Sequence, residues 1–171
     1  MIFNEIFNMI YITVYIISKY YIIMDSAFFG TLPQTLQGKT GEVAVTQLPE
    51  ENEFIGLYFS AHWCPPCRQF TPMLAEFYKN VNKDKKQVEI IFVSSDHNQK
   101  DFDDYFATMP WIAVPFDSDN KELLGDQYGI QGIPTLLIFD KKGKLVDQAG
   151  RATVMQQNLK AIDSWKAKAS A

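Results

Sequence analysis

Two segments of the chain are almost continuously hydrophobic. Residues 54–60 and 88–94 carry apolar or aromatic side chains at most positions, and runs of this length are typical of strands buried on both faces of a sheet. A third run, residues 135–139, is separated from its expected partner strand, residues 145–149, by a turn-like segment that contains Gly143. This spacing predicts a β-hairpin.

Apolar side chains at helical spacing mark four further segments. The predicted helices cover residues 68–80, 96–108, 121–128 and 154–168. Pro72 lies inside the first of them and is expected to kink it. In the last one, Leu159, Ile162 and Trp165 are expected to point toward the core.

The rest of the chain gives weaker patterns. Residues 25–39 are expected to be irregular or to form a short helix, and residues 42–46 alternate polar and apolar positions like a half-buried strand. We expect a turn at residues 48–52 and a short extended piece at residues 114–116. The order of the elements, βαβα and then ββα, predicts an α/β fold in which a mixed central sheet is flanked by helices on both faces.

The N-terminal segment differs in composition from the rest. Residues 1–23 are rich in Ile, Tyr, Phe and Asn, and the composition changes abruptly after Met24. We therefore expect a single domain at residues 24–171 and a separate apolar leader before it. Three interpretations of the leader stay open: translated non-coding sequence upstream of a start at Met24, a membrane anchor or targeting segment, and a structural helix. A cleaved signal peptide is disfavoured, because the first residues include Glu5 and no basic side chain.

Composition and charge narrow the class of protein. The 171 residues are 47% hydrophobic and 14% aromatic, which is enough for one sizeable core. The net charge is −4 and basic residues are interspersed with acidic ones. The basic footprint of a nucleic-acid-binding protein is therefore absent, and we expect no nucleic-acid partner. We also expect a monomer.

Cys64 and Cys67 are the only cysteines of the chain. Two thiols three positions apart can open and close one disulfide, which makes a two-electron redox switch. They follow the predicted strand at residues 54–60 and precede a predicted helix, whose positive N-terminus should lower the pKa of the Cys64 thiol. No metal site is expected, because zinc takes four ligands and only His62 and His97 remain as further soft ligands.

The residues around the cysteines identify a family. The run 63–67, Trp-Cys-Pro-Pro-Cys, followed by Phe-Thr-Pro at 70–72, resembles the active site of the thioredoxin superfamily. Residues 132–139 look like the cis-proline loop of that family and the strand after it. Residues 109–116 and the two prolines between the cysteines narrow the resemblance to the tryparedoxin and nucleoredoxin branch. The likeness spans residues 38–169 and implies a thioredoxin fold and thiol–disulfide exchange.

The resemblance implies a role for each cysteine. Cys64, the more exposed one, attacks a substrate disulfide, and the buried Cys67 then attacks Cys64 and releases the reduced substrate. No cofactor is expected beyond this disulfide. Pro65 and Pro66 are expected to stiffen the loop and to remove two backbone N–H donors. Their presence predicts a reductant rather than a strong oxidant, because the reduced form then has fewer donors to stabilise it.

The resemblance assigns binding roles to further residues. Pro134 is expected to be cis, which leaves the backbone of Ile133 free to pair with an extended substrate segment. Trp63 is expected to shield the thiolate and to form part of the docking surface. Arg151 matches a basic position at which tryparedoxins contact their thiol donor.

Several positions depart from the family pattern. Many thioredoxins have a buried aspartate where this chain has Tyr58, so proton transfer at Cys67 must use another group or water. Tryparedoxins have a tryptophan and an acid at the positions of Ser95 and His97, and residues 94–96 look more like nucleoredoxins. The electron donor therefore stays open among a low-molecular-weight dithiol, glutathione and a flavoprotein reductase.

The expected function is the reduction of protein disulfides, with peroxiredoxin-type proteins as examples of targets. The alternative is a nucleoredoxin-like module, in which oxidation of the Cys64–Cys67 pair gates the binding of a partner and turnover is incidental. We expect a cytoplasmic protein, or a membrane-anchored or organellar one if residues 1–23 are translated as an anchor or targeting segment.

Overall fold

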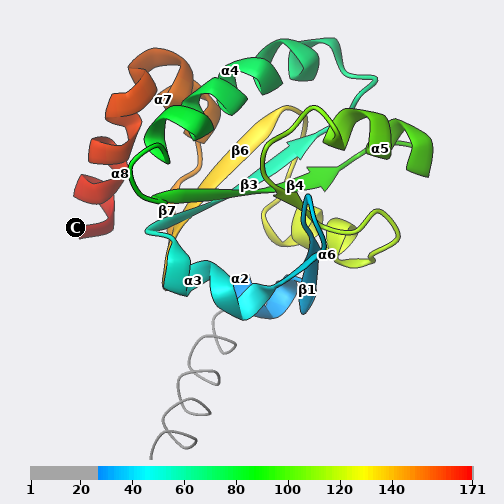
Figure 1. Cartoon of the computed structure of the whole chain (residues 1–171), viewed down its shortest axis with the longest axis horizontal. Coiled ribbons are helices and arrows are strands. Elements are labelled where there is room, and N and C mark those ends of the chain that lie inside the picture. The colour runs from blue at the N-terminus through cyan, green and yellow to red at the C-terminus, as the bar shows by residue number, and fades with distance from the viewer. Residues whose placement is uncertain (1–26, 171) are drawn as a thin grey trace, which may run out of the picture.

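The computed structural model describes residues 27–170, which form a three-layer α/β fold (Figure 1). The strands are β1 (Thr35–Gln37), β2 (Glu42–Ala44), β3 (Phe54–Ser60), β4 (Val88–Ser94), β5 (Ile112–Ala113), β6 (Thr135–Asp140) and β7 (Leu145–Asp147). The helices are α2 (Ala27–Thr31), α3 (Leu48–Glu51), α4 (Pro65–Val81), α5 (Gln99–Phe106), α6 (Asn120–Gln127), α7 (Gly150–Gln157) and α8 (Ala161–Ser170). The expectations for residues 1–23 concern a segment outside the described residues.

The sheet is mixed and has the strand order β2-β1-β5-β4-β3-β6-β7. β3 runs parallel to β4 on one side and antiparallel to β6 on the other. Every residue of β3 and β4 is buried, which confirms that residues 54–60 and 88–94 are central strands. The predicted hairpin is also present as β6 and β7, and Gly143 in its turn adopts a left-handed φ of 81°, which favours glycine.

Helices cover both faces of the sheet, as the order of elements predicted. α4, α5, α7 and α8 lie on one face, and α2, α3 and α6 lie on the other (Figure 1). Successive residues of β3 alternate between the two sides. Phe54 and Tyr58 belong to the core under α4 and α8, whereas Ile55 and Leu57 belong to the core against α2 and α6. Packing on both faces therefore fixes the position of the C-terminal end of β3, and the redox pair follows shortly after it in the chain.

The helices before and after β4 follow the predictions with small shifts. α4 contains Pro72 and runs to Val81, one residue beyond its predicted end. α5 begins three residues later than expected, because the side chain of Asn98 caps its N-terminus. The aromatic residues predicted on its inner face, Phe102, Tyr105 and Phe106, are all buried.

Several short elements differ from the predictions. Residues 35–37 form a strand that the sequence pattern did not reveal. Residues 48–51 form a short helix rather than a turn, and the extended piece expected at residues 114–116 lies two residues earlier, as β5. The strand expected at residues 42–46 ends at Ala44 and continues as a 3-10 turn. These elements are so short that contacts with their neighbours, rather than local periodicity, decide their form.

The last helix is divided, contrary to the prediction of one helix over residues 154–168. Asn158 lies between α7 and α8 and adopts a φ of 47°, which interrupts the helix. Ile162 and Trp165 are buried as predicted, but Leu159 lies in the break and is 50% exposed. The prediction that Leu159 points toward the core is therefore wrong, because the break turns it out of the helical register.

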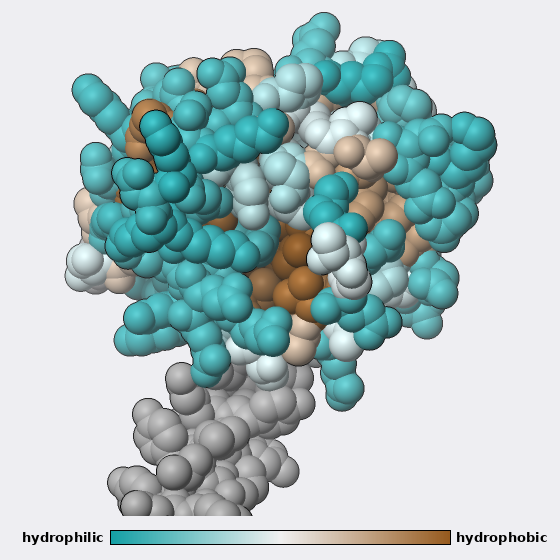
Figure 2. All heavy atoms as spheres, in the orientation of Figure 1, coloured by the Kyte–Doolittle hydropathy of each residue, from teal (hydrophilic) through white to brown (hydrophobic). Residues whose placement is uncertain are grey.

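The face shown in Figure 2 is covered mostly by hydrophilic residues, and apolar residues gather near its middle. Within residues 27–170, no helix combines the length and the apolar character that crossing a membrane requires.

Candidate redox site

The two cysteines lie where β3 passes into α4. Cys64 is the N-cap residue of α4 and has extended backbone angles. Its Sγ atom accepts a hydrogen bond from the backbone N–H of Cys67 at 3.3 Å. Pro65 and Pro66 occupy the first two helical positions, where the missing N–H removes no helical hydrogen bond. The N–H of Cys67 is therefore the first that the helix presents to Cys64.

Cys64 and Cys67 are joined in a disulfide, with 5.2 Å between their Cα atoms. Cys64 is 3% exposed and Cys67 is fully buried, so the expected difference in exposure is small in this oxidised form. Ala61 and Ile133 pack against the pair and account for its burial. Within residues 27–170, no three His, Cys, Asp or Glu side chains are grouped as metal ligands.

The loop before β6 completes the site from the other side. The Ile133–Pro134 peptide bond is cis, as the resemblance implied. The carbonyl oxygen of Ile133 lies 3.8 Å from Sγ of Cys64, and the Thr135 hydroxyl donates to the carbonyl of Gly132 at 2.7 Å across the bend. The loop thus places a backbone peptide group beside the sulfur.

Trp63 lies at the surface next to the pair and is 49% exposed. Its indole N–H donates to the carbonyl of Ser95 at 3.0 Å. Its ring stacks on His97, with 5.5 Å between the ring centroids. The loop after β4 therefore holds the Trp63 side chain in position through Ser95 and His97. The docking role of Trp63 stays a prediction.

A buried carboxylate, not predicted from the sequence, ties the loops after β3 and β4 together. One oxygen of Asp96 accepts the backbone N–H of His62 at 2.7 Å, and the other accepts the hydroxyl of Ser94 at 2.8 Å. Arg68 donates to the carbonyl of His62 at 2.6 Å. Asp96 follows a buried strand, as Cys64 does, and neighbouring parallel strands end at the same edge of a sheet. The position of Asp96 just after a buried strand was the signal in the sequence that could have predicted its place beside the redox pair.

Four hydroxyl groups form a closed ring on the helix side of β3. They belong to Tyr58 and Ser60 of β3, Thr71 of α4 and Tyr105 of α5, and adjacent oxygens lie 2.5–3.0 Å apart. All four residues are buried. The Thr71 hydroxyl also donates to the carbonyl of Cys67 at 3.0 Å. Tyr58, predicted only as a core residue, is thus part of a polar cluster, which we call the hydroxyl ring.

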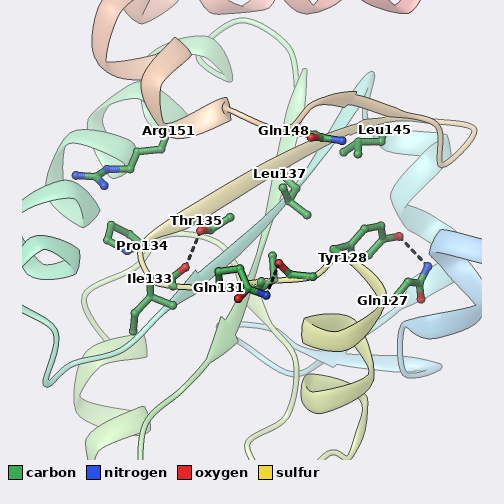
Figure 3. A pocket seen from close by; sticks show the side chains of 13 residues that line it. Gln127, Tyr128, Gln131, Ile133, Pro134, Thr135, Leu137, Leu145, Gln148 and Arg151 are labelled. Carbon is green, nitrogen blue, oxygen red and sulfur yellow. Dashed lines mark hydrogen bonds between the residues drawn. The ribbon is translucent and has the colours of Figure 1, made fainter.

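A pocket of about 780 Å³ borders the cis-proline loop. It is lined by residues 127–135, Leu137, Leu145, Gln148 and Arg151. Figure 3 shows Arg151 reaching from α7 toward α4, near Pro134. The guanidinium lies 5.7 Å from the centroid of the Phe70 ring, and the buried Nε atom has no hydrogen-bond partner within residues 27–170. Arg151 thus lines this pocket, and its contact with an electron-donating thiol stays a prediction.

Comparison with known proteins places the chain in a family. A family model described as thioredoxin-like matches residues 52–145, which is more than half of the chain. The chain belongs to the thioredoxin-like family. Nucleoredoxin from Danio rerio is 45% identical over 116 residues, and tryparedoxin from Trypanosoma brucei brucei is 42% identical over 132 residues. These relatives confirm the resemblance that the motifs indicated.

The two relatives of this thioredoxin-like chain differ in how much of their length is matched. The alignment with nucleoredoxin covers 67% of this chain and 28% of that protein, so the chain spans about a quarter of the nucleoredoxin length. The alignment with tryparedoxin covers 76% of this chain and 90% of that protein. The likeness to tryparedoxin therefore extends over nearly the whole relative.

Solved structures share the thioredoxin-like fold described above. Native tryparedoxin I from Crithidia fasciculata matches with a TM-score of 0.71 at 38% identity, over 78% of this chain and 94% of that one. Tryparedoxin II complexed with glutathionylspermidine matches with a TM-score of 0.68 at 34% identity, over 79% and 92% of the two chains. The predicted fold, a mixed sheet with helices on both faces, is confirmed.

Proposed function

We propose that this chain is a thiol–disulfide oxidoreductase that reduces protein disulfides by cycling the Cys64–Cys67 pair between dithiol and disulfide. The observation that carries the proposal is the disulfide at the N-terminus of α4, next to the Ile133 peptide group and beside an exposed Trp63. A disulfide that closes so short a loop adds little stability by chain entropy. Its place at a helix N-terminus, beside the exposed Trp63, therefore favours chemistry over structure.

The first step is attack by Cys64. In the dithiol, the N–H of Cys67 and the positive end of α4 stabilise the thiolate of Cys64. This thiolate attacks a disulfide of the substrate, forms a mixed disulfide and expels one substrate thiolate. Cys67 then attacks Cys64, which restores the disulfide and releases the second substrate thiolate. An electron donor reduces the pair again.

The docking surface is formed by the neighbours of Cys64. We propose that the peptide group of Ile133, which lies beside the Cys64 sulfur, pairs with an extended segment of the substrate. Trp63 provides an exposed aromatic face next to it, and aromatic side chains are common anchors in protein interfaces. Pro65 and Pro66 stiffen the loop between the two cysteines.

Peroxiredoxin-type proteins are proposed targets, and a low-molecular-weight thiol is the proposed donor. The relative that was solved with glutathionylspermidine supports this class of donor. In the present chain, Arg151 lines the pocket beside Pro134, and we propose that its guanidinium contacts the thiol that supplies the electrons. Glutathione and a flavoprotein reductase are the other candidates. The proposed location is the cytoplasm.

Reduction of insulin disulfides by the full chain, driven by dithiothreitol, tests the proposal. We expect catalytic turnover from the wild type and none from Cys64→Ser, because the serine hydroxyl cannot form the mixed disulfide. Cys67→Ser should instead trap the mixed disulfide after one attack. Absence of turnover by the wild type, with a reducible Cys64–Cys67 bond, would exclude the reductase.

That negative outcome would favour a second function, a nucleoredoxin-like module whose partner binding depends on the redox state of the pair. Two observations support this alternative. The nucleoredoxins are among the relatives with about 45% identity. Residues 94–96, at the end of β4 and in the loop that contacts Trp63, are Ser-Ser-Asp, which resembles nucleoredoxins. Such a module binds a partner in one redox state and releases it in the other, without turnover.

A further inference from the structure

The residues that lead into Cys64 form a tight turn. The backbone N–H of Cys64 donates to the carbonyl of Ala61 at 3.3 Å, which closes a four-residue turn with His62 and Trp63 at its centre. The direction in which the Cys64 side chain leaves the backbone therefore depends on how this turn is held against the rest of the fold.

Both backbone groups of His62 are bound by ionisable side chains. Its N–H donates to a carboxylate oxygen of Asp96 at 2.7 Å, and its carbonyl accepts from the guanidinium of Arg68 at 2.6 Å. Hydrogen bonds with an ionised donor or acceptor are roughly twice as strong as those between neutral groups. We call Asp96, Arg68 and the His62 backbone the His62 clamp. It joins the turn to the loop after β4 on one side and to α4 on the other.

Arg68 also holds the turn through its own backbone. The N–H of Arg68 donates to the carbonyl of Cys64 at 3.1 Å, so one residue of α4 binds His62 with its side chain and Cys64 with its main chain. The Arg68 side chain is exposed, and it forms no salt bridge within residues 27–170. Its hydrogen bond to His62 therefore has no competing ion pair.

Asp96 is a buried carboxylate that takes part in no salt bridge with another described residue. One oxygen accepts from the His62 N–H, and the other accepts from the Ser94 hydroxyl. Removing a carboxylate from water is costly unless hydrogen bonds replace the lost hydration. Here the bonds that offset this cost hold the turn before Cys64, which points to a role in positioning rather than in core packing.

We propose that the His62 clamp positions Cys64 for attack on a protein disulfide, with Asp96 and Arg68 as positioning residues. The inference rests on the proposed oxidoreductase function, because it concerns the first step of that reaction. The Cys64 thiolate forms a bond to one substrate sulfur, and the other substrate sulfur leaves as a thiolate with the electron pair of the broken bond. The attacking sulfur must lie in line with that bond, so a small displacement of the turn slows the step.

Reduction of insulin by the full chain, driven by dithiothreitol, tests the clamp with two variants. Asp96→Ala leaves the His62 N–H without its acceptor, and Arg68→Met keeps the aliphatic stem but removes the donors. We expect each variant to lower kcat by roughly 10-fold to 10²-fold. KM should be nearly unchanged, because neither side chain belongs to the docking surface proposed at Trp63 and Ile133.

A second readout separates alignment from reactivity of the sulfur. Alkylation of Cys64 by iodoacetamide requires no aligned disulfide. Its rate at high pH, where the thiol is fully ionised, should therefore stay nearly unchanged in both variants. A loss of folding would instead change the alkylation of both cysteines, since Cys67 is buried in the native structure.

Matched variants distinguish the clamp from an effect of charge. Asp96→Asn keeps an oxygen that can accept from the His62 N–H, so most of kcat should return. Asp103→Ala and Lys79→Met remove exposed charges from α5 and α4 outside the clamp, and kcat should not change. Arg68→Met alters an exposed side chain, so it provides a folded variant should Asp96→Ala fail to fold.

Combining the two substitutions gives a further test. Asp96 and Arg68 hold the same turn, so the loss of kcat in the double variant should be smaller than the product of the two single losses. A full product would mean that the two residues act independently, contrary to a shared clamp.

The inference is overturned if folded Arg68→Met keeps the kcat of the wild type, or if Lys79→Met lowers kcat equally. It is also overturned if Asp96→Asn is as slow as Asp96→Ala, because the carboxylate would then act through its charge. An inactive wild type would overturn the proposed function and this inference with it. An active wild type with unchanged variants would overturn the clamp alone.

Discussion

The chemistry of Cys64 depends on atoms from distant parts of the chain. The N–H of Cys67 reaches its sulfur from within the same helix turn, whereas the carbonyl of Ile133 arrives from a loop 69 residues later in sequence. Asp96 acts indirectly, by holding the backbone of His62 before the helix. Each contact constrains either the sulfur or the loop that carries it.

At the residue scale, Arg151→Gln is expected to weaken the use of an anionic thiol donor. The change removes the positive charge and the N–H groups of the guanidinium at the pocket beside Pro134. A hydrogen bond to a charged group contributes about 1.5–3 kcal/mol. The KM for glutathione should therefore rise by roughly tenfold or more, with kcat nearly unchanged. Steady-state kinetics with glutathione, and with uncharged dithiothreitol for comparison, measure the separate effects on KM and kcat.

Lys142→Gln is the matched control, because Lys142 is an exposed cation in the turn after β6, away from this pocket. An equal rise in KM for both variants, or an equal loss with dithiothreitol, would show that Arg151 does not contact the donor.

At the scale of elements, the long and strongly patterned segments could be predicted from the sequence, and the short ones could not. β3 and β4 match their predicted ranges because burial on both faces requires apolar residues throughout. β1 has three residues, too few for a periodic pattern, and its pairing with β2 and β5 holds it in place. The break at Asn158 was also missed, because a single left-handed residue leaves the surrounding helical spacing nearly intact.

The same limit applies to the site. Cys64, Cys67 and Pro134 belong to contiguous motifs and could be found by inspection of the sequence. The hydroxyl ring could not, because Ser60 and Tyr105 are 45 residues apart and meet only when α5 packs on the sheet. Buried polar groups find partners through space, and a single sequence does not record those pairings.

Two glycines in helices provide a matched pair of tests for α7. At Gly150, an added Cβ would lie 2.7 Å from the carbonyl oxygen of Leu136, so Gly150→Ala forces α7 away from β6. At Gly125 in α6, an added Cβ meets nothing within 4 Å. We expect Gly150→Ala to lower the free energy of unfolding by about 1–3 kcal/mol and Gly125→Ala to raise it by up to about 1 kcal/mol.

Urea unfolding of both variants measures the difference. Equal stability of Gly150→Ala and the wild type would mean that α7 can shift on the sheet without loss, contrary to the close contact with Leu136.

A buried carboxylate joins β7 to the two C-terminal helices and makes their packing dependent on pH. Burial raises the pKa of Asp147, but hydrogen bonds from Thr153, Trp165 and Lys168 outweigh that effect and hold the pKa below its usual value. The stabilisation is therefore complete above the ordinary aspartate pKa and is lost as the pH falls through the lower value of the folded state.

Asp147→Asn should accordingly lower the free energy of unfolding at neutral pH by about 1–3 kcal/mol and lessen its decline below about pH 4. Asn in place of the exposed Asp84, in the loop after α4, is the control and should change neither quantity. Denaturant unfolding at a series of pH values measures the free energy of unfolding of each variant. Parallel profiles of stability against pH for Asp147→Asn and the wild type would contradict the role given to Asp147.

At the scale of the whole molecule, the two cores on either side of the sheet must form together, since β3 contributes to both. α2 closes the second core: Phe28, Phe29 and Leu32 are buried there, and Phe28 stacks on Phe139 of β6 with 4.1 Å between the centroids. Although α2 is short, it therefore belongs to the folded unit.

A chain that starts at residue 33 should thus be less stable than one that starts at residue 25. It loses three buried apolar side chains, each contributing about 1.5–3 kcal/mol, so the loss should be on the order of 5 kcal/mol. Guanidinium unfolding of the two shortened chains measures it, and equal midpoints would show that α2 is not part of the core.

The residues that hold Trp63 in position are different from those that contact the Cys64 sulfur, so the two sets can change independently in evolution. The indole rests on Ser95 and His97, which lie outside the Trp-Cys-Pro-Pro-Cys run, whereas the sulfur chemistry depends on α4 and the cis-proline loop. Under the docking role proposed for Trp63, substitutions at residues 95 and 97 would therefore change the recognition of a partner, while the thiol–disulfide chemistry of the two sulfurs stays as inherited.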